Sequence, residues 1–127
     1  MKWVLNFAAV GEAGTGLALL IVPSLVGRLL LGGELTGVAI PVARITGIAL
    51  VALAVACFSA GEAGHGLSGM LTYSLLATLY LVYLGINGEW VGSLLWPAAA
   101  IHAALTFLLG IAWLKTRQFK GTKVRSD

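Results

Sequence analysis

The chain has 127 residues, of which 59% are hydrophobic and 10% are charged, and its mean hydropathy is +0.97. A soluble domain usually carries about 25% charged residues, so this composition excludes an ordinary water-soluble domain. The formal net charge of +3 does not indicate a nucleic-acid-binding surface, because five of the eight Lys and Arg residues lie in the last 13 positions.

The first apolar segment can be interpreted in two ways. We prefer a membrane span at about 3–22 that ends at Pro23, followed by a short interfacial helix at 24–31. This placement lets the long side chain of Arg28 reach the membrane surface. The alternative is one span at about 13–31 that is kinked at Pro23.

Three further apolar segments are each long enough to cross a bilayer, which takes roughly 20 residues at about 1.5 Å each. They lie at about 38–60, 67–86 and 90–114. The sequence therefore predicts an all-α polytopic membrane protein, a four-transmembrane-helix bundle that fills residues 1–114. Residues 115–127 form a basic tail, and we expect its polar end at 121–127 not to be ordered.

The distribution of cations predicts the orientation of the bundle. An even number of spans places both termini on one side, together with Lys2 and five tail cations, namely Lys115, Arg117, Lys120, Lys123 and Arg125. Only Arg28 and Arg44 lie toward the other side. Lys and Arg accumulate on the cytoplasmic side of membrane proteins, so we expect both termini to be cytoplasmic.

Two short motifs recur along the chain. Residues 11–17 and 61–67 are identical in six of seven positions, and 33–37 resembles 88–92. One interpretation is a parallel two-helix repeat. The other, which we favour, is chance similarity in a chain rich in Gly and Ala, because the two pairs have different spacings, 50 and 55 residues.

Three ionisable residues fall inside the predicted spans. By helical rise, Glu12 and His102 lie about 16 Å and 18 Å below the outer ends of their spans, and Arg44 lies about 9 Å below its own. One interpretation is an intramembrane polar centre, with Glu12 as a proton or cation site, Arg44 as its counter-charge and His102 as a relay or ligand. The alternative is a structural ion pair with a hydrogen-bonded histidine. An isolated buried charge is costly, so we expect Glu12 to be paired or protonated.

Hydroxyl groups and one proline suggest a pocket near this centre. Tyr73 and Tyr80 lie seven residues apart on one helix face, so they could line a pocket with Thr106 for a quinone or a lipid head group. Hydrogen bonding between helices is the interpretation that we favour. Pro97 falls inside the fourth predicted span, where a kink could open a cavity beside His102, although a kink that serves packing is the favoured alternative.

The sequence contains few other residues that indicate a metal, nucleotide or catalytic site. The chain contains no CxxC, P-loop or GxSxG motif and no His pair at helical spacing, so no metal site is predicted and an enzyme activity is disfavoured but left open. Cys57 is the only cysteine, which excludes an intrachain disulfide. No cofactor is predicted; a haem held by His102 or a quinone beside it is kept as a weaker alternative.

The chain resembles a group of small bacterial membrane proteins of about this length, to which no activity is assigned. The residues that carry the resemblance are 11–20, Pro23, 29–32, 44–50, 80–85, 95–97 and His102. The resemblance implies four helices in the bacterial inner membrane. It implies no activity and no site residues.

These observations favour a non-catalytic function. We expect an accessory or structural subunit that packs, within the lipid bilayer, against other membrane-protein subunits or copies of itself, and we expect no nucleic-acid partner. The first alternative is a small carrier or channel for protons, ions or solutes that uses Glu12, Arg44 and His102. The second is a quinone- or haem-associated subunit of a redox complex.

Overall fold

The computed structural model of the chain describes residues 2–59 and 65–126. These residues form five α-helices and no strand. The helices are α1 (Lys2–Ile21), α2 (Pro23–Leu31), α3 (Ala39–Ser59), α4 (His65–Asn87) and α5 (Leu95–Ser126). All except α2 are long and apolar enough to cross a membrane. The prediction of an all-α chain with four spans is confirmed, and the separate short helix that we expected after the first span is present as α2.

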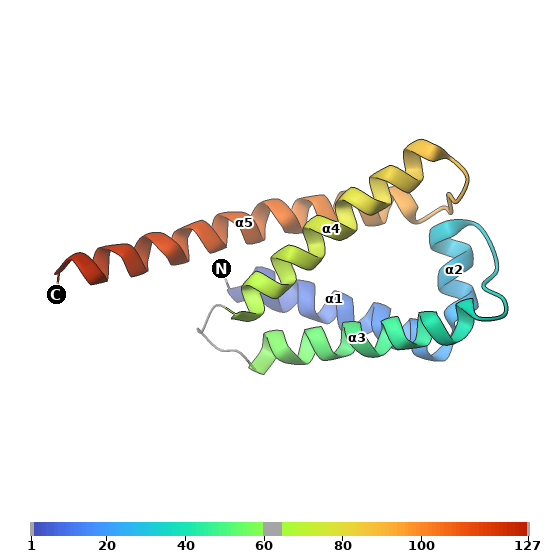
Figure 1. The fold of residues 1–127 in the computed structure, drawn as a ribbon, viewed down its shortest axis with the longest axis horizontal. Helices are drawn as coiled ribbons and strands as arrows, with labels where there is room; N and C mark the ends of the chain where they lie inside the picture. Colours follow the sequence, from blue (N-terminus) through green and yellow to red (C-terminus); the bar gives the residue numbers. More distant parts are fainter. Residues whose placement is uncertain (1, 60–64, 127) are drawn as a thin grey trace.

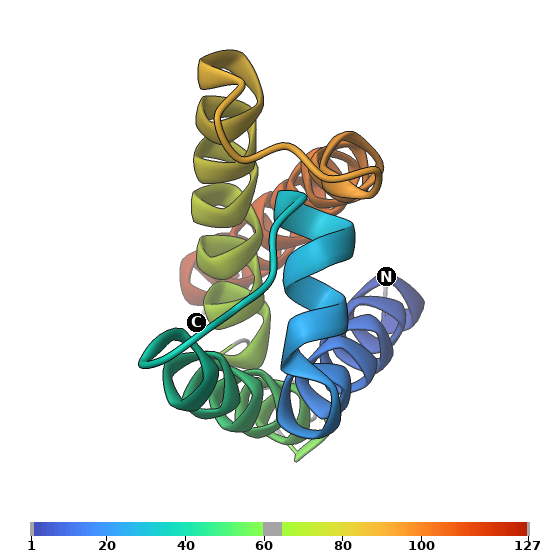
Figure 2. The same ribbon diagram turned by 90° about the vertical axis from the view of Figure 1, so that its right-hand side faces the viewer.

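The four long helices form two antiparallel pairs (Figure 1). Helix α1 packs along α3, and α4 packs along α5. Helices α3 and α4 approach each other at the end of the bundle that carries both chain termini and diverge toward the other end (Figure 1). We call the first end the termini end. At the second end, the α2 end, α2 extends from the α1–α3 pair toward the α4–α5 pair (Figure 2).

Helices α1 and α3 meet backbone to backbone at Gly16 and Gly47. A Cβ atom on Gly16 would lie 2.7 Å from the carbonyl oxygen of Gly47, and a Cβ atom on Gly47 would lie 2.5 Å from that of Gly16. The buried residues on either side follow helical spacing: Val4, Ala8, Ala9, Glu12 and Gly16 on α1, and Gly47, Leu50, Ala54 and Cys57 on α3. Small residues of this kind let helices approach closely in lipid, where apolar side chains alone do not drive association.

The α2 end is held together by backbone hydrogen bonds. The last carbonyl groups of a helix lack partners within it. In α2, the N–H of Gly92 donates to the Leu30 carbonyl at 3.0 Å, and the N–H of Leu94 donates to the Leu29 carbonyl at 2.8 Å. A Cβ atom on Gly92 would overlap the Leu29 carbonyl, so the approach requires glycine. The 88–94 connection therefore joins the two helix pairs by capping α2.

Helix α2 also has clear boundaries of its own. Pro23 occupies its first turn, where a missing N–H costs nothing. Gly32 ends the helix with a left-handed conformation, φ 76°, and its N–H donates to the Arg28 carbonyl at 3.1 Å. The Arg28 side chain is exposed and forms an ion pair with Glu34. The interfacial position of α2 stays a prediction.

Helix α5 differs from its predicted span at both ends. It begins at Leu95 rather than near residue 90, so Pro97 lies in its first turn and causes no kink inside a span. It continues to Ser126, so the expectation that 121–126 are not ordered is wrong. The last turns of α5 include several good helix formers, namely Lys115, Arg117, Gln118, Lys120, Lys123 and Arg125. At about 1.5 Å per residue, α5 exceeds the roughly 30 Å that a span requires.

The two recurrent motifs are placed differently. Gly16, near the end of the first copy of 11–17, is buried well inside α1, whereas its counterpart Gly66 is the second residue of α4. Residues 61–64 of the second copy lie outside the described residues. The motif at 33–37 and its counterpart at 88–92 both fall in connections at the α2 end. Only the second motif pair thus occupies comparable positions in the two halves.

The glycine contact predicts a position-specific effect on stability. Gly47→Ala should lower the free energy of unfolding by about 1–3 kcal/mol, because the new methyl group meets the backbone of α1 rather than a flexible side chain. Gly14→Ala is the matched control on α1, because no atom lies within 4 Å of the added Cβ. Thermal unfolding in detergent, followed by circular dichroism, measures both. Equal effects of the two substitutions would contradict the proposed contact.

Candidate functional site

Three helices bring polar side chains together inside the bundle. Glu12 comes from α1, Tyr73 from α4 and His102 from α5. Glu12 Oε1 lies 3.9 Å from His102 Nδ1, and the two side chains are 6% and 15% exposed. The Tyr73 side chain forms a hydrogen bond with Glu12, and its ring meets the His102 ring edge-on, with centroids 5.7 Å apart. We call Glu12, Tyr73 and His102 the polar centre.

The helix contacts explain how the polar centre is assembled. Glu12 lies one turn before Gly16, on the same buried stripe of α1. Because Gly16 touches α3, the Glu12 side chain is directed into the bundle rather than toward lipid. His102 follows Ala99 by three residues, and Ala99 is buried on α5. Tyr73 packs against the main apolar core between the helices. The apolar surroundings make each polar contact in this centre costly to lose.

A row of hydroxyl groups continues from the polar centre between α4 and α5. The hydroxyl oxygens of Thr78 and Thr106 are 3.4 Å apart. Each hydroxyl also lies 2.7 Å from the carbonyl oxygen four residues earlier, that of Ser74 for Thr78 and that of His102 for Thr106. This is the usual way in which Thr is satisfied inside a helix. Each hydroxyl has a single proton, so a hydrogen bond between the two threonines would replace one of these bonds to a carbonyl. The two hydroxyls are therefore in contact between α4 and α5 near His102.

Two buried polar atoms have no hydrogen-bond partner among the described residues. They are His102 Nδ1 and Ser74 Oγ. The 3.9 Å between His102 Nδ1 and Glu12 Oε1 is too long for a hydrogen bond. An unsatisfied buried polar group costs about 1–3 kcal/mol, and most native groups avoid that cost. Both atoms can take part in a further hydrogen bond, and His102 Nδ1 gives the polar centre unused hydrogen-bonding capacity beside the Glu12 carboxyl.

Arg44 is not part of this centre, which corrects its predicted role as the counter-charge of Glu12. The Arg44 side chain is exposed and forms no ion pair or hydrogen bond with the described residues. The reason is the rotation of α3: its interior face passes through Gly47, Leu50 and Ala54, and this face leaves Arg44 to one side. The ionisable side chain that faces Glu12 is therefore His102 and not Arg44.

Tyr80 also lies apart from the predicted pocket. Its side chain is 61% exposed and stacks on Tyr83, with ring centroids 6.2 Å apart. Tyr73, seven residues earlier, is half-buried in the centre. Helix α4 diverges from α3 toward the α2 end (Figure 1). The two residues share a helix face, which is partly covered at Tyr73 and open at Tyr80. Tyr73 and Thr106 thus lie near His102, whereas Tyr80 does not.

Depth alone could have assigned Tyr73 to the centre. Tyr73 precedes Tyr80 by seven residues, which places it about 10 Å further along the helix axis. That shift brings it to the level at which the sequence already placed Glu12 and His102. The sequence analysis grouped Tyr73 with Tyr80 by helix face instead. A shared helix face did not identify the residues of the polar centre, because neighbouring helices cover only part of α4. The depth of a residue is a better guide here, because it follows directly from the fixed rise per residue.

Cofactor chemistry finds limited support in this arrangement. The described residues contain no group of three His, Cys, Asp or Glu side chains that could hold a metal ion. His65 begins α4 beside Thr116, and Thr116 lies 14 residues, or about 21 Å, along α5 from His102. The two histidines therefore cannot ligate one haem within a single chain. The outward position of Tyr80 removes it from the suggested quinone pocket.

The polar centre predicts different outcomes for two Glu12 substitutions. Glu12→Gln should leave the melting temperature nearly unchanged, because an amide of the same shape can still bond with Tyr73 and no Arg44 ion pair is lost. Glu12→Ala should cost about 1–3 kcal/mol, because it leaves the Tyr73 hydroxyl without this partner. Thermal unfolding of the purified protein in detergent measures both. A large loss for Glu12→Gln would show that the carboxyl forms a strong ion pair.

A double-mutant cycle serves as the control. Residues in contact show coupling energies of about 0.5–3 kcal/mol, whereas distant residues add independently. We expect coupling between Glu12→Ala and His102→Ala, and none between Glu12→Ala and Arg44→Gln. Strong coupling to Arg44 would return that residue to the centre.

Comparison with known proteins gives no further guidance to this site. The chain matches no protein-family model, no curated protein and no solved structure. The resemblance to small bacterial membrane proteins accordingly stays an expectation from the sequence. The function is therefore argued from the geometry of this chain and from the chemistry of its exposed and buried polar groups.

Proposed function

We propose that this protein is a non-catalytic membrane subunit that assembles with other chains in the bilayer through the outward face of α3. The observation that carries the proposal is Arg44, an exposed cation in a helix of apolar side chains, with no partner among the described residues. A charge inside the hydrocarbon costs at least about 2.5–3.5 kcal/mol for Arg at a helix centre. A neighbouring chain that offers an acidic or polar group would lower this cost.

Arg44 also has a simpler candidate role, as an anchor of α3 at the lipid head groups. The residue lies five positions, or about 8 Å, from the start of α3 at Ala39, so its side chain can also reach toward lipid head groups. In that case Arg44 would anchor the helix without binding another chain. The two roles differ in what removal of the charge does to assembly, which the experiment below measures.

The exposed surface of the spans supports assembly. Of the four long helices, α4 is the least buried inside the chain. Its outward face carries the stacked Tyr80–Tyr83 pair, and α3 presents Ile45 and Ile48 beside Arg44. Tyrosine hydroxyls inside a span gain stability from hydrogen bonds to another helix. Arg44 on α3 and the hydroxyls of Tyr80 and Tyr83 on α4 are therefore polar groups for which the described residues supply no hydrogen bond or ion pair.

The charge distribution supports an orientation of the bundle in the bacterial inner membrane. Both termini lie at the same end of the bundle (Figure 1), and Lys2 and the five basic residues of α5 share that end. The positive charge supports a cytoplasmic location for this end. We assign the protein to the bacterial inner membrane, where the last turns of α5 would extend into the cytoplasm.

Assembly predicts a charge-dependent complex. Native mass spectrometry after gentle extraction should detect the wild-type chain bound to a second chain. Arg44→Leu should release the chain as a monomer, because the buried cation no longer pairs across the interface, whereas Arg44→Lys should retain much of the complex. Ile45→Leu, an adjacent exposed apolar change, is the control. A monomeric wild type, or a complex unaffected by Arg44→Leu, would refute assembly through this face.

A second function, a small proton or solute carrier, is favoured by the polar centre. Glu12 and His102 come from helices far apart in sequence, are both largely buried, and lie 3.9 Å apart, a distance that one small movement could close to a hydrogen bond. An acid and an imidazole in this relation can exchange a proton. This version of the carrier uses Glu12, Tyr73 and His102, and it no longer includes Arg44.

Carrier function predicts flux that depends on the polar centre. In proteoliposomes with an imposed pH gradient, the wild-type protein should dissipate the gradient faster than empty vesicles. Glu12→Gln and His102→Ala should each reduce this rate by about tenfold or more, since each removes one proton-exchanging group. Thr15→Ala is the control, because Thr15 is exposed on the same helix as Glu12. Flux equal to that of empty vesicles, or flux unchanged in both variants, would exclude the carrier.

A further inference from the structure

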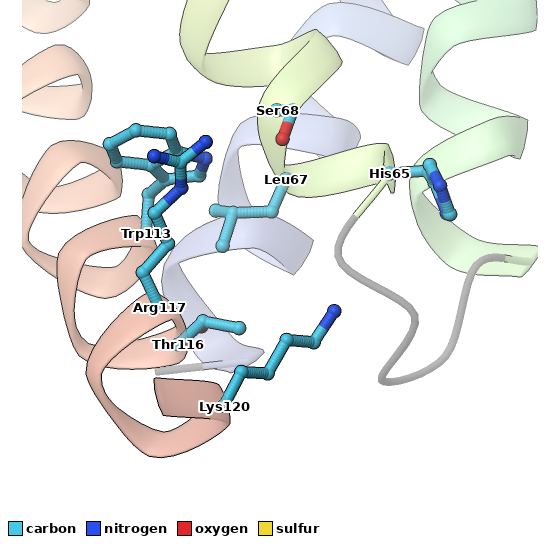
Figure 3. A pocket seen from close by; sticks show the side chains of 7 residues that line it. All are labelled: His65, Leu67, Ser68, Trp113, Thr116, Arg117 and Lys120. Carbon is cyan, nitrogen blue, oxygen red and sulfur yellow. The ribbon is translucent and has the colours of Figure 1, made fainter. Parts of the chain in front are cut away.

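A basic pocket lies at the termini end, away from the polar centre. It has a cavity volume of about 230 Å³ and lies between the first turn of α4 and the part of α5 that follows its apolar stretch. Figure 3 shows the side chains that line it: His65, Leu67, Ser68, Trp113, Thr116, Arg117 and Lys120. None of these seven described residues is acidic. The pocket thus combines fixed positive charge with hydrogen-bonding groups and an aromatic ring.

The arrangement of Arg117 makes the pocket suitable for an oxyanion. Its guanidinium carbon lies 4.2 Å from the centroid of the Trp113 ring. A cation–π contact of this kind restrains the guanidinium group. The planar donors that Arg offers match two oxygens of a phosphate group at once. Figure 3 shows the Arg117 side chain against Trp113, with Lys120 extending from the next turn of α5 toward α4.

Two further features favour a negative ligand. The pocket adjoins the N-terminus of α4, a helix of 23 residues, where the helix dipole attracts anions. The Thr116 hydroxyl donates to the Ala112 carbonyl at 2.9 Å, so its proton is already used within the helix. The charged donors in the lining are Arg117 and Lys120. The described lining therefore carries net positive charge, from two cations beside a helix N-terminus.

The size and position of the pocket indicate which part of a ligand it holds. Its volume is below the roughly 300–1,000 Å³ of typical small-molecule sites, so it fits a phosphate group better than a large organic ligand. It lies where the apolar stretch of α5 ends at Leu114 and the cations begin at Lys115. This boundary is the level at which lipid phosphates meet a membrane helix.

We propose that this pocket binds the phosphate group of an anionic lipid, through Arg117 and Lys120 and the N-terminus of α4. Trp113 holds the guanidinium in place, and Leu67 contributes apolar surface beside it. The site is separate from the polar centre and does not depend on assembly through α3. A soluble phosphate compound has the same recognition chemistry, and the experiment distinguishes the two sources.

The test compares two variants with equal loss of charge. R117Q/K120Q removes two cations from the pocket, whereas K123Q/R125Q removes two cations of the same helix that do not line it. Native mass spectrometry measures phosphatidylglycerol retained by the purified full chain. We expect R117Q/K120Q to lower retention by about tenfold, because the charge-assisted hydrogen bonds are lost, and K123Q/R125Q to change it by less than about twofold. R117K/K120R, which keeps both charges, should restore part of the retention.

Two further probes identify the source of the phosphate. Phosphatidylcholine, with no net charge, should not be retained under the same conditions. Inorganic phosphate should bind more weakly than phosphatidylglycerol. Equal binding of the two, with the same dependence on Arg117 and Lys120, would overturn the proposal that the ligand is a lipid and would assign the pocket to a soluble phosphate compound. Equal loss of phosphatidylglycerol in both double variants, or no loss in either, would overturn the pocket itself. Circular dichroism confirms that each variant is folded.

Discussion

The backbone contact between Gly16 and Gly47 determines how the charged groups of the spans are presented. A helix with side chains at both positions could not approach its neighbour so closely, because each added Cβ would meet the backbone of the other helix. The contact therefore fixes the rotation of α1 and α3 about their axes. Glu12, one turn from Gly16, is directed inward, and Arg44, three residues before Gly47, is left outside. Helix packing thus keeps apart Glu12 and Arg44, which the long reach of the arginine side chain would otherwise allow to pair.

The two helix pairs are joined at two places along the bundle, at the α2 end and at the polar centre. At the α2 end, the 88–94 connection donates backbone hydrogen bonds to the last carbonyls of α2. Deeper in the bundle, Glu12 from one pair meets Tyr73 and His102 from the other. Lipid offers no substitute for the Glu12–Tyr73 hydrogen bond, since the bilayer core contains almost no water. The polar centre therefore stabilises the bundle whether or not it also moves protons, and the two roles are compatible.

The three proposals concern different surfaces of one small chain. Arg44 and the tyrosines of α4 face outward within the spans, where another membrane helix can reach them. The basic pocket lies at the termini end, where lipid phosphates are available. The polar centre is enclosed between these surfaces. Arg44, Arg117 and Lys120 lie where another helix or a lipid phosphate can reach them, which matters because each charge inside lipid is costly.

The sequence by itself determined the number of spans and the shared depth of Glu12 and His102, and it favoured, without deciding, a separate helix after Pro23. These features are local: a span requires a fixed length of apolar chain, proline begins a helix without loss, and the rise per residue is constant. Tertiary structure alone decided that Arg44 and Tyr80 face outward, that Tyr73 joins the polar centre, and that the first turn of α4 meets α5 in a basic pocket. The physical reason is that lipid and protein interior are both apolar, so the pattern of a membrane helix does not show which of its faces will be covered.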